Sequence, residues 1–444
     1  MNKKHTPTVA FHTLGCKVNQ HDTAIMAALF QDSGYAVVDF HEVADVYVVN
    51  TCTVTHLSDR KSRQMLRRAA GENPEAIVVA CGCYAQTAAK ELEGLDEVDL
   101  IIGTNERHRV VEAVEQFAKD HQRQIYLPEK NDLFYYENLP HERVSGMTRA
   151  YVKIQEGCNQ FCTYCIIPYA RGPLRSRSED DTIEEINGLV AAGYKEVILT
   201  GIHIGAYGRG LKDETCDLTG LCRRILDETA IARLRIGSLE GVEVTDDLIE
   251  MIATNPRMAR QLHLPLQSGC DQTLAAMRRP YDTAAFREMV AAIRARVPDI
   301  AITTDIMVGF PGETDEDFQA SLAFADEMAF SDMHIFKYSQ RDGTPAATMP
   351  NQVDPRIKDA RAKEMAAVAA RNKIAYEEAL IGRRVRLLLE EPLGDGRWVG
   401  HSSNYLYVTV TGEGLSSGRF VDAVLTGRQE GRLQGELINS DEEE

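Results

Sequence analysis

The stretch "AYVKIQEGCNQFCTYCIIPYARG", residues 150–172, joins a predicted β-strand to a loop with three closely spaced cysteines. Cys158, Cys162 and Cys165 follow the spacing C-x3-C-x2-C. A structural zinc ion or a complete [4Fe–4S] cluster usually takes four protein ligands, so this loop leaves one position without a protein ligand. A zinc loop whose fourth ligand lies elsewhere in the chain is one interpretation, and a deliberately incomplete iron–sulfur site is the other.

Six strand patterns alternate with helix patterns from residue 149 to about residue 375, and the three-cysteine loop follows the first of them. The strand patterns are residues 150–155, 196–201, 233–239, 261–267, 300–308 and 332–339. This alternation predicts a partial or complete (β/α) barrel, in which chemistry takes place at the carboxyl ends of the strands. The cysteine loop is placed at that end.

Two further units flank the predicted barrel, and together they give an α/β fold class. Residues 1–130 alternate predicted strands and helices and indicate a parallel α/β domain, with strands at 8–14, 44–50, 75–80 and 98–104 and helices at 22–34 and 57–70. Residues 131–148 break the pattern and indicate a linker. A long charged helix (355–382) and short alternating runs then indicate a small antiparallel β-barrel, with the runs at 383–391, 397–412, 418–427 and 435–438. The predicted domains are 1–130, 149–375 and 376–440.

The composition is that of an ordinary soluble protein, with 44% hydrophobic and 26% charged residues among 444. No window is apolar enough to span a membrane, and the start "MNKKHTPTVAF" lacks the apolar segment of a secretory signal. We therefore expect a cytoplasmic protein. The cytosol keeps thiols reduced, so the ten cysteines favour metal binding over disulfides.

Four cysteines of the N-terminal domain lie at the ends of three predicted strands. Cys16 lies in "HTLGCKVNQ", Cys52 in "VVNTCTVTH", and Cys81 and Cys83 in "VVACGCYAQ". Open α/β sheets bind ligands at the carboxyl ends of their strands, so these thiols should converge in space. Buried structural cysteines are the alternative. Cys216, Cys222 and Cys270 lack such a context, and we interpret them as small apolar or loop residues.

Several long motifs in a fixed order resemble the radical SAM enzymes, in which three cysteines hold a [4Fe–4S] cluster with one open iron for S-adenosylmethionine (SAM). "LTGIHIGAYG" (199–208) resembles the glycine-containing motif after the second barrel strand. "RIGSLEG" (235–241), "HLPLQSGCDQTLAAMRRPY" (263–281) and "TDIMVGFPGETDEDF" (304–318) resemble motifs of one subfamily, the methylthiotransferases. The resemblance covers most of residues 150–345.

The resemblance implies two [4Fe–4S] clusters. One would be held by Cys158, Cys162 and Cys165, and an auxiliary one by Cys16, Cys52 and Cys83. Cys83 is preferred to Cys81 because "GCYAQ" matches the family pattern, and Cys81 is expected to point the other way at the exit from the strand. By fold analogy, the expected SAM contacts are Thr200, Gly201, Ser238, Glu240, Val308 and Phe310.

Basic residues are grouped in three places although the net charge is −18. Arg60, Lys61, Arg63, Arg67 and Arg68 lie on one predicted helix. Arg171, Arg175 and Arg177 follow the cysteine loop. The C-terminal barrel, which resembles the RNA-binding TRAM domain, carries Trp398, Tyr405 and the arginines 383, 384, 386, 397, 419, 428 and 432. These groups predict salt-dependent RNA binding, and solvated helix faces are the alternative.

The resemblance is strongest to the branch that modifies threonylcarbamoyladenosine in tRNA. The expected activity is therefore transfer of a methylthio group to C2 of N6-threonylcarbamoyladenosine beside the tRNA anticodon. The expected partners are tRNA and an electron donor such as a flavodoxin or ferredoxin, with no membrane partner. Family branches that act on isopentenyladenosine or on a ribosomal protein aspartate are alternatives. A non-catalytic iron–sulfur or zinc protein that binds RNA is the rival from another class.

Overall fold

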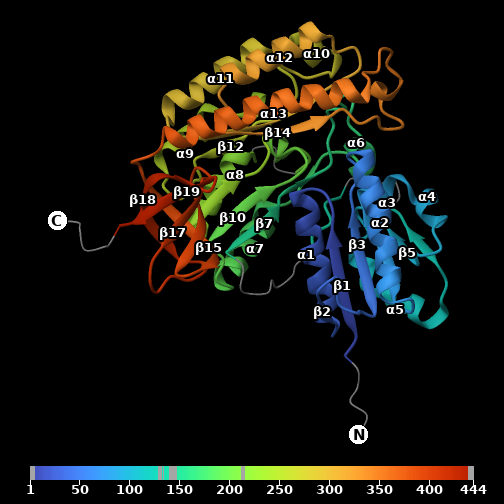
Figure 1. The fold of residues 1–444 in the computed structure, drawn as a ribbon. Helices are drawn as coiled ribbons and strands as arrows, with labels where there is room; N and C mark the ends of the chain where they lie inside the picture. Colours follow the sequence, from blue (N-terminus) through green and yellow to red (C-terminus); the bar gives the residue numbers. More distant parts are fainter. Residues whose placement is uncertain (1–5, 129–132, 134, 140–147, 212–215, 439–444) are drawn as a thin grey trace.

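The computed structural model describes residues 6–128, 133, 135–139, 148–211 and 216–438. Three units follow one another in the chain and lie side by side (Figure 1). The N-terminal sheet is at one side of the molecule, the strands β7 to β14 are in the middle, and a small β-barrel is at the other side. None of the described helices has the length and apolar character needed to cross a membrane.

The N-terminal unit is a six-stranded parallel sheet with the order β2-β1-β3-β4-β5-β6. Its strands are β1 (Thr8–Thr13), β2 (Ala36–Val38), β3 (Val46–Thr51), β4 (Ile77–Gly82), β5 (Leu100–Ile102) and β6 (Gln124–Tyr126). Its helices are α1 (Lys17–Asp32), α2 (His56–Glu72), α3 (Cys83–Thr87), α4 (Ala89–Glu93) and α5 (Val110–Asp120). The predicted parallel sheet is confirmed. The central strands are apolar on both faces because helices cover both.

The middle unit is a curved sheet of six parallel strands in chain order. The two halves are β7 (Arg149–Lys153), β10 (Glu196–Thr200) and β11 (Arg233–Ile236), then β12 (Gln261–His263), β13 (Ala301–Val308) and β14 (Asp332–Lys337). Parallel bridges between Leu234 and Met258 and between Ser238 and His263 join the halves. All six predicted strands are present, and β7 and β14 form the two ends of the curved sheet.

Helices cover the outer face of this curved sheet (Figure 1). They are α7 (Glu179–Ala191), α8 (Leu218–Glu228), α9 (Asp246–Thr254), α10 (Asp271–Ala276), α11 (Thr283–Arg296), α12 (Asp315–Glu327) and α13 (Pro355–Glu378). The short helix α6 (Ile167–Arg171) follows the cysteine loop and instead packs against α3 of the N-terminal unit. Alternate strand residues such as Val197, Leu199 and Ile302 point outward into the largest hydrophobic core. The residues between them, including Glu196, Arg235 and Asp305, therefore point into the interior of the barrel, which is polar.

The C-terminal unit is a closed barrel with the order β15-β16-β17-β19-β18. Its strands are β15 (Arg384–Gly394), β16 (Arg397–Ser402), β17 (Tyr407–Thr411), β18 (Phe420–Gln429) and β19 (Arg432–Leu437). Four of the five strand pairings are antiparallel, as predicted, and β17 pairs with β19 in parallel.

The small barrel docks at the amino ends of the middle strands. Arg233 donates hydrogen bonds to the carbonyls of His401 and Arg386, and Arg235 donates to those of Ser402 and Ser403. The cysteine loop lies at the opposite, carboxyl end of the same sheet.

Most of the predicted linker, residues 131–148, lies outside the described residues. The described residues 135–139 are held in place, because the Tyr136 hydroxyl donates a hydrogen bond to the Lys153 carbonyl at 2.6 Å. Glu137 also pairs with Arg107 at 2.8 Å. These contacts attach the described piece both to the first barrel strand and to the N-terminal unit.

Candidate active site

Three N-terminal cysteines converge at the carboxyl edge of the parallel sheet. Cys16, Cys52 and Cys83, here called the N-terminal triad, follow β1, β3 and β4, and these strands are neighbours in the sheet. A Cβ atom built on Gly15 would lie 3.1 Å from the Cys52 Sγ atom, so the first two loops are in contact. Cys16 is exposed and the other two are buried. The predicted convergence of the three loops is therefore present in the fold.

Burial and mutual charge both act on this triad. Burial raises the pKa of the Cys83 thiol to about 12; Arg171 opposes this, and charges on Cys52 and Cys16 add to it. Burial also raises the pKa of Cys52, with Cys16 acting in the same direction. The three thiols are thus close enough to affect one another. Without a cation, burial favours the neutral thiols of Cys52 and Cys83, whereas bound iron would favour the thiolates.

Cys81 points away from the triad. Its side chain is in the core on the opposite face of the sheet, where its Sγ atom is 3.9 Å from the Met26 sulfur and 3.6 Å from the Val49 carbonyl. Burial raises its pKa far above the usual range. The two cysteines point different ways, as expected, because β4 ends at Gly82, where φ is +90°, and Cys83 begins α3. Cys81 is therefore a core residue.

The barrel triad is Cys158, Cys162 and Cys165, in the loop between β8 (Gln155–Glu156) and α6. The loop closes on itself, because the Cys158 amide donates to the Gly172 carbonyl at 3.2 Å and the Cys165 amide to the Cys162 carbonyl at 2.9 Å. Gly157 permits this closure. Its φ is +71°, and a Cβ there would be only 2.0 Å from the Pro173 carbonyl oxygen.

An arginine donates a hydrogen bond to one sulfur of the barrel triad. Arg279 Nη1 is 3.3 Å from the Cys162 Sγ atom, and the same guanidinium pairs with Glu240. Burial raises the pKa of Cys165 to about 12, and charges on Cys162 and Cys158 act in the same direction. As in the N-terminal triad, the three thiols are mutual neighbours in a largely dry setting.

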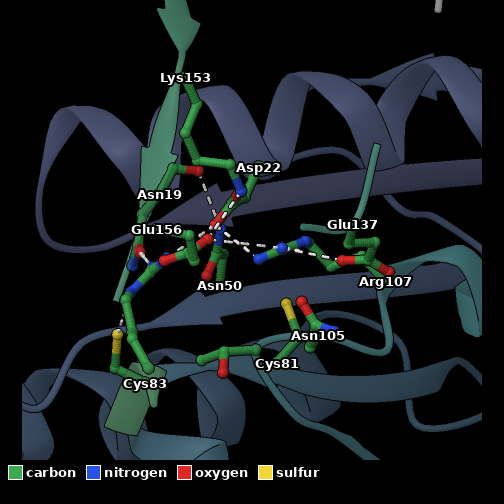
Figure 2. A network of polar contacts seen from close by, with 12 residues as sticks. Asn19, Asp22, Asn50, Cys81, Cys83, Asn105, Arg107, Glu137, Lys153 and Glu156 are labelled. Carbon is green, nitrogen blue, oxygen red and sulfur yellow. Dashed lines mark hydrogen bonds and ion pairs between the residues drawn. The ribbon is translucent and has the colours of Figure 1, made fainter. Parts of the chain in front are cut away.

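A buried ion network joins the N-terminal unit to β7, β8 and α6, the elements on either side of the barrel triad in the chain (Figure 2). Lys153 of β7 is 2.6 Å from Asp22 of α1 and 2.9 Å from Glu156, and Arg107 is 2.8 Å from Asp22. Arg171 of α6 lies 2.7 Å from Glu156 and donates from Nε to the Cys83 Sγ atom at 3.1 Å. Burial acts to raise the pKa of Asp22, but Arg107, Lys153 and Arg171 outweigh it and lower that pKa.

Arg171 therefore bridges the two units. It lies six residues after Cys165 in the chain, yet it contacts a cysteine of the other triad. Its guanidinium is fully buried and also bonds to Asn19 and Asp22. The position of one triad relative to the other is consequently fixed by charge-assisted hydrogen bonds.

A cavity of about 170 Å³ lies between the units. One wall is formed by Val54 and Thr55, directly after Cys52, and the other by Cys165, Asp305 and Met307 of the barrel. The cavity thus borders loops that carry members of both triads. A molecule bound there would be in reach of both cysteine loops.

The expected SAM contacts are distributed around the barrel mouth. Thr200 is buried at the end of β10, and Gly201 lies against Gln155, whose carbonyl oxygen would be 2.9 Å from a Cβ at that position. Ser238 is exposed after β11, and Glu240 is paired with Arg279. These four assignments stay predictions.

The two expected adenine contacts are both buried in protein. Val308 is part of the largest core, between the strands and their covering helices. Phe310 packs against Tyr338, with ring centroids 5.6 Å apart, in a smaller cluster with Met277 and Ala346. A role toward adenine stays a prediction for both.

The expected RNA contacts after the cysteine loop are wrong. Arg171, Arg175 and Arg177 are at most 5% exposed. Arg175 donates to the carbonyls of Arg171 and Pro173, and Arg177 pairs with Glu185. Closeness to the cysteine loop in sequence does not place these arginines on the surface. All three are buried and hydrogen-bonded inside the protein.

The other basic groups are partly neutralised. On α2, Arg63, Arg67 and Arg68 pair with Glu91, Glu97 and Glu72, while Arg60 and Lys61 are exposed. In the C-terminal barrel, Tyr405 lies under Arg235 at 4.6 Å and is stacked on His401 at 4.7 Å. Tyr405 therefore takes part in the contact between the barrels, although 39% of it is exposed.

Sequence reasoning missed the residues that support the triads. Arg279, Asp22, Arg107 and Lys153 had no assigned role, although Arg279 lies in the quoted motif "MRRPY" (277–281). Its place in that motif was the available signal. The partners of Asp22 are 85 and 131 residues away in the chain, so nothing in the local sequence indicates the network.

The fold and the open three-cysteine loop define a radical SAM enzyme, and comparisons with known proteins agree. The model of the radical SAM superfamily matches residues 152–325, and that of the uncharacterized protein family UPF0004 matches residues 8–103. The solved structure of the radical SAM methyltransferase TsrM from Kitasatospora setae has a TM-score of 0.55 at 14% identity, covering 88% of this chain and 79% of that one. That likeness concerns the fold.

Curated relatives narrow the class. The threonylcarbamoyladenosine tRNA methylthiotransferase MtaB of Bacillus subtilis is 40% identical over 420 residues, 93% of this chain and 92% of that protein. A tRNA-2-methylthio-N(6)-dimethylallyladenosine synthase of Clostridium perfringens is 33% identical over 434 residues, 96% of both. The chain belongs to the radical SAM methylthiotransferase family and is a transferase.

Membership implies SAM and a [4Fe–4S] cluster, and the barrel triad fits such a cluster. Its three sulfurs are mutual neighbours, and thiolate sulfur is the ligand that iron–sulfur clusters take. Arg279 also donates a hydrogen bond to one of these sulfurs, that of Cys162. The N-terminal triad has the same composition and a matching donor in Arg171.

Proposed function

We propose that the protein is a tRNA methylthiotransferase that acts on N6-threonylcarbamoyladenosine at position 37, next to the anticodon, and adds a methylthio group at C2 of the adenine. Two relatives support this substrate. The MtaB proteins of Bacillus subtilis and Aquifex aeolicus, both named for threonylcarbamoyladenosine, are 40% and 36% identical. Relatives named for dimethylallyladenosine are 33–37% identical.

The observation that carries the proposed reaction is that one cavity is bordered by Cys165 of the barrel triad and by Val54 and Thr55, which directly follow Cys52 of the N-terminal triad. When bound, a cluster on the barrel triad supplies the electron that cleaves SAM, and a second cluster on the N-terminal triad supplies a site for the sulfur to be transferred. That chemistry would be directed at the hydrogen on adenine C2. Hydrogen removal and methylthio transfer both act on the same adenine. A base held in the cavity would lie close to both cysteine loops.

The chain's own residues hold the site in place and keep it dry. Arg171 and Arg279 each donate to one ligand sulfur, and each guanidinium is also bound to a carboxylate that fixes its position. Such donors stabilise negative charge on the thiolate and orient it. Burial of Cys52, Cys83 and Cys162 excludes water from the region where a carbon radical would otherwise be quenched.

Substrate tRNA would be held mainly by the C-terminal barrel, which we interpret as TRAM-like. Arg383, Arg397 and Arg432 are exposed there, whereas Arg428 pairs with Glu377. Exposed arginines bind phosphate, and the RNA affinity should therefore fall as salt is raised. A flavodoxin or ferredoxin would supply electrons.

Mass spectrometry of tRNA nucleosides tests the substrate. Cells lacking the gene should lose the methylthio form of threonylcarbamoyladenosine and keep that of dimethylallyladenosine, and the wild-type gene should restore it. Persistence of the methylthio form of threonylcarbamoyladenosine would refute the proposed substrate. Loss of only the methylthio form of dimethylallyladenosine would favour the dimethylallyl branch.

Metal analysis separates the enzyme from an RNA-binding iron–sulfur or zinc protein without catalysis. Anaerobic reconstitution should give about eight irons with matching sulfide per chain, for two clusters. About one zinc and no sulfide would support the rival.

A further inference from the structure

Two histidines and an aspartate from three neighbouring strands meet in the barrel interior. His263 ends β12, Asp305 is in β13 and His334 is in β14, and one ligand atom from each lies within 4.8 Å of the other two. The Nε2 atom of His263 is 3.3 Å from the Asp305 carboxylate. Asp305 and His334 are direct partners in the strand register, so their side chains point to the same face.

The surroundings prepare these groups to bind a cation. Thr303 lies beside His263, with its hydroxyl 2.9 Å from Nδ1, which leaves Nε2 to face Asp305. A hydrogen bond on the other ring nitrogen is the usual support of a metal-binding histidine. In the part of the chain that the structure describes, no lysine or arginine lies within 4.0 Å of the Asp305 carboxylate, so its charge is not already neutralised by a direct ion pair.

The position of the cluster gives it access to ligands. The side chains of His263 and Asp305 are 14% and 25% exposed, and His334 is exposed. Asp305 also lines the cavity of about 170 Å³ that borders Cys165. An ion held by three side chains would therefore adjoin the cavity proposed for the substrate.

We propose that His263, Asp305 and His334 form a binding site for a divalent transition-metal ion, separate from both cysteine triads. Two imidazoles and one carboxylate are ligands that suit zinc and its first-row neighbours better than magnesium or calcium. Three protein ligands leave a fourth position of a tetrahedral ion for water or for an oxygen of a molecule in the cavity. The site requires no iron–sulfur chemistry, and its ability to bind a metal does not depend on which tRNA nucleoside is the substrate.

Zinc binding by the holoprotein tests this site. The untagged protein with its clusters assembled is titrated anaerobically with zinc chloride in a calorimeter, and zinc and iron are then counted after gel filtration. We expect one zinc per chain with no loss of iron. The variants His334→Ala and Asp305→Asn should bind at least tenfold more weakly, and His41→Ala, which removes an exposed histidine of the N-terminal unit, should match the wild type.

A second measurement needs no variant. X-ray absorption at the zinc edge of the wild-type complex should give only nitrogen and oxygen ligands, at about 2.0–2.1 Å, with imidazole scattering. Sulfur at about 2.3 Å would mean that zinc occupies a cysteine triad and would overturn the proposal. Absence of tight zinc in the wild type, or equal binding by all variants, would overturn it as well.

Discussion

Single side chains decide which sulfurs are available at the site. Cys81 and Cys83 are two residues apart, yet one is in a hydrophobic core beside Met26 and the other bonds to Arg171. The difference follows from β4, which ends at Gly82, where φ is +90° and the chain turns into α3. Residues two apart in a continuous strand would share a face, so it is the end of β4 and the turn at Gly82 that give the two cysteines different surroundings.

Replacing these two cysteines should have different effects on iron content. Cys83→Ala should reduce the iron of the reconstituted protein from about eight to about four per chain, because one cluster loses a ligand. Cys81→Ala should keep all the iron and cost about 1–2 kcal/mol of stability, since it deletes a buried sulfur without touching the site. Iron and sulfide assays with a thermal melt check both. Equal iron loss in the two variants would contradict the assignment of Cys83.

Removing Arg171 should destabilise the junction between the units. Arg171→Met leaves Asp22 and Glu156 with less positive charge in a buried position, and breaking such a network costs about 3–5 kcal/mol. The denaturation midpoint should fall clearly. Arg67→Met is the matched control, because its 3.6 Å pair with Glu97 is exposed and worth less than about 1 kcal/mol. Similar midpoints for the two variants would show that the network does not hold the units together.

At the scale of elements, loops after parallel strands carry nearly all the functional groups. The N-terminal triad follows β1, β3 and β4, which are adjacent in the sheet although 36 and 31 residues separate the cysteines. The barrel triad follows β7 and the short β8. The parallel arrangement puts all these loops at carboxyl edges that face each other across the junction.

The tight turn before the barrel triad gives a test at this scale. Gly157→Ala should lose the cluster of that triad, because the new Cβ would lie 2.0 Å from a backbone oxygen and the loop cannot close. Gly193→Ala is the control. Gly193 has a comparable φ of +95°, but no atom lies within 4 Å of a Cβ built there. Only the first variant should lose iron, and full iron content in Gly157→Ala would show that the loop tolerates opening.

Strands were predictable where they form short, mostly apolar runs between helix patterns. All six middle strands and the four central N-terminal strands were expected from such runs, whereas β2 and β6, at the two edges of the sheet, were missed because they are short and partly exposed. Helix α1 begins at Lys17, earlier than the expected residue 22, since its first turn is polar and faces the site. Local patterns indicate elements well and their ends poorly.

The candidate site was predictable only as far as its cysteines. Motif spacing indicated six thiols, and the fold brings them together in two sets. The spacing did not indicate that Arg171 is buried, nor that His263, Asp305 and His334 meet, because those contacts join residues from separate strands. Whether a charged side chain is buried and paired depends on the tertiary structure, and a basic stretch of sequence alone indicates neither.

In the whole molecule, the two ends of the middle barrel have different partners. The N-terminal unit and the cysteine loops share one end, and the C-terminal barrel docks at the other through Arg233 and Arg235. A tRNA bound to the C-terminal barrel would therefore have to extend along the molecule to present its anticodon loop to the cavity.

Replacing Arg383, Arg397 and Arg432 together by alanine should weaken tRNA binding and leave the fold intact, since all three are exposed. The plot of log affinity against log salt should become shallower by about 0.7–0.9 for each lost phosphate contact. Filter binding over a range of salt measures this slope. The same slope as in the wild type would show that the C-terminal barrel does not contact the tRNA backbone.

The central claim is that the barrel triad serves SAM cleavage and the N-terminal triad serves sulfur transfer. One anaerobic assay tests this claim. Two variants, one with alanines at Cys158, Cys162 and Cys165 and one with alanines at Cys16, Cys52 and Cys83, are incubated with SAM, reductant and tRNA, and 5′-deoxyadenosine and methylthio nucleoside are quantified together. The first variant should form neither product. The second should form 5′-deoxyadenosine without the methylthio nucleoside, and methylthio transfer by either variant would contradict the account.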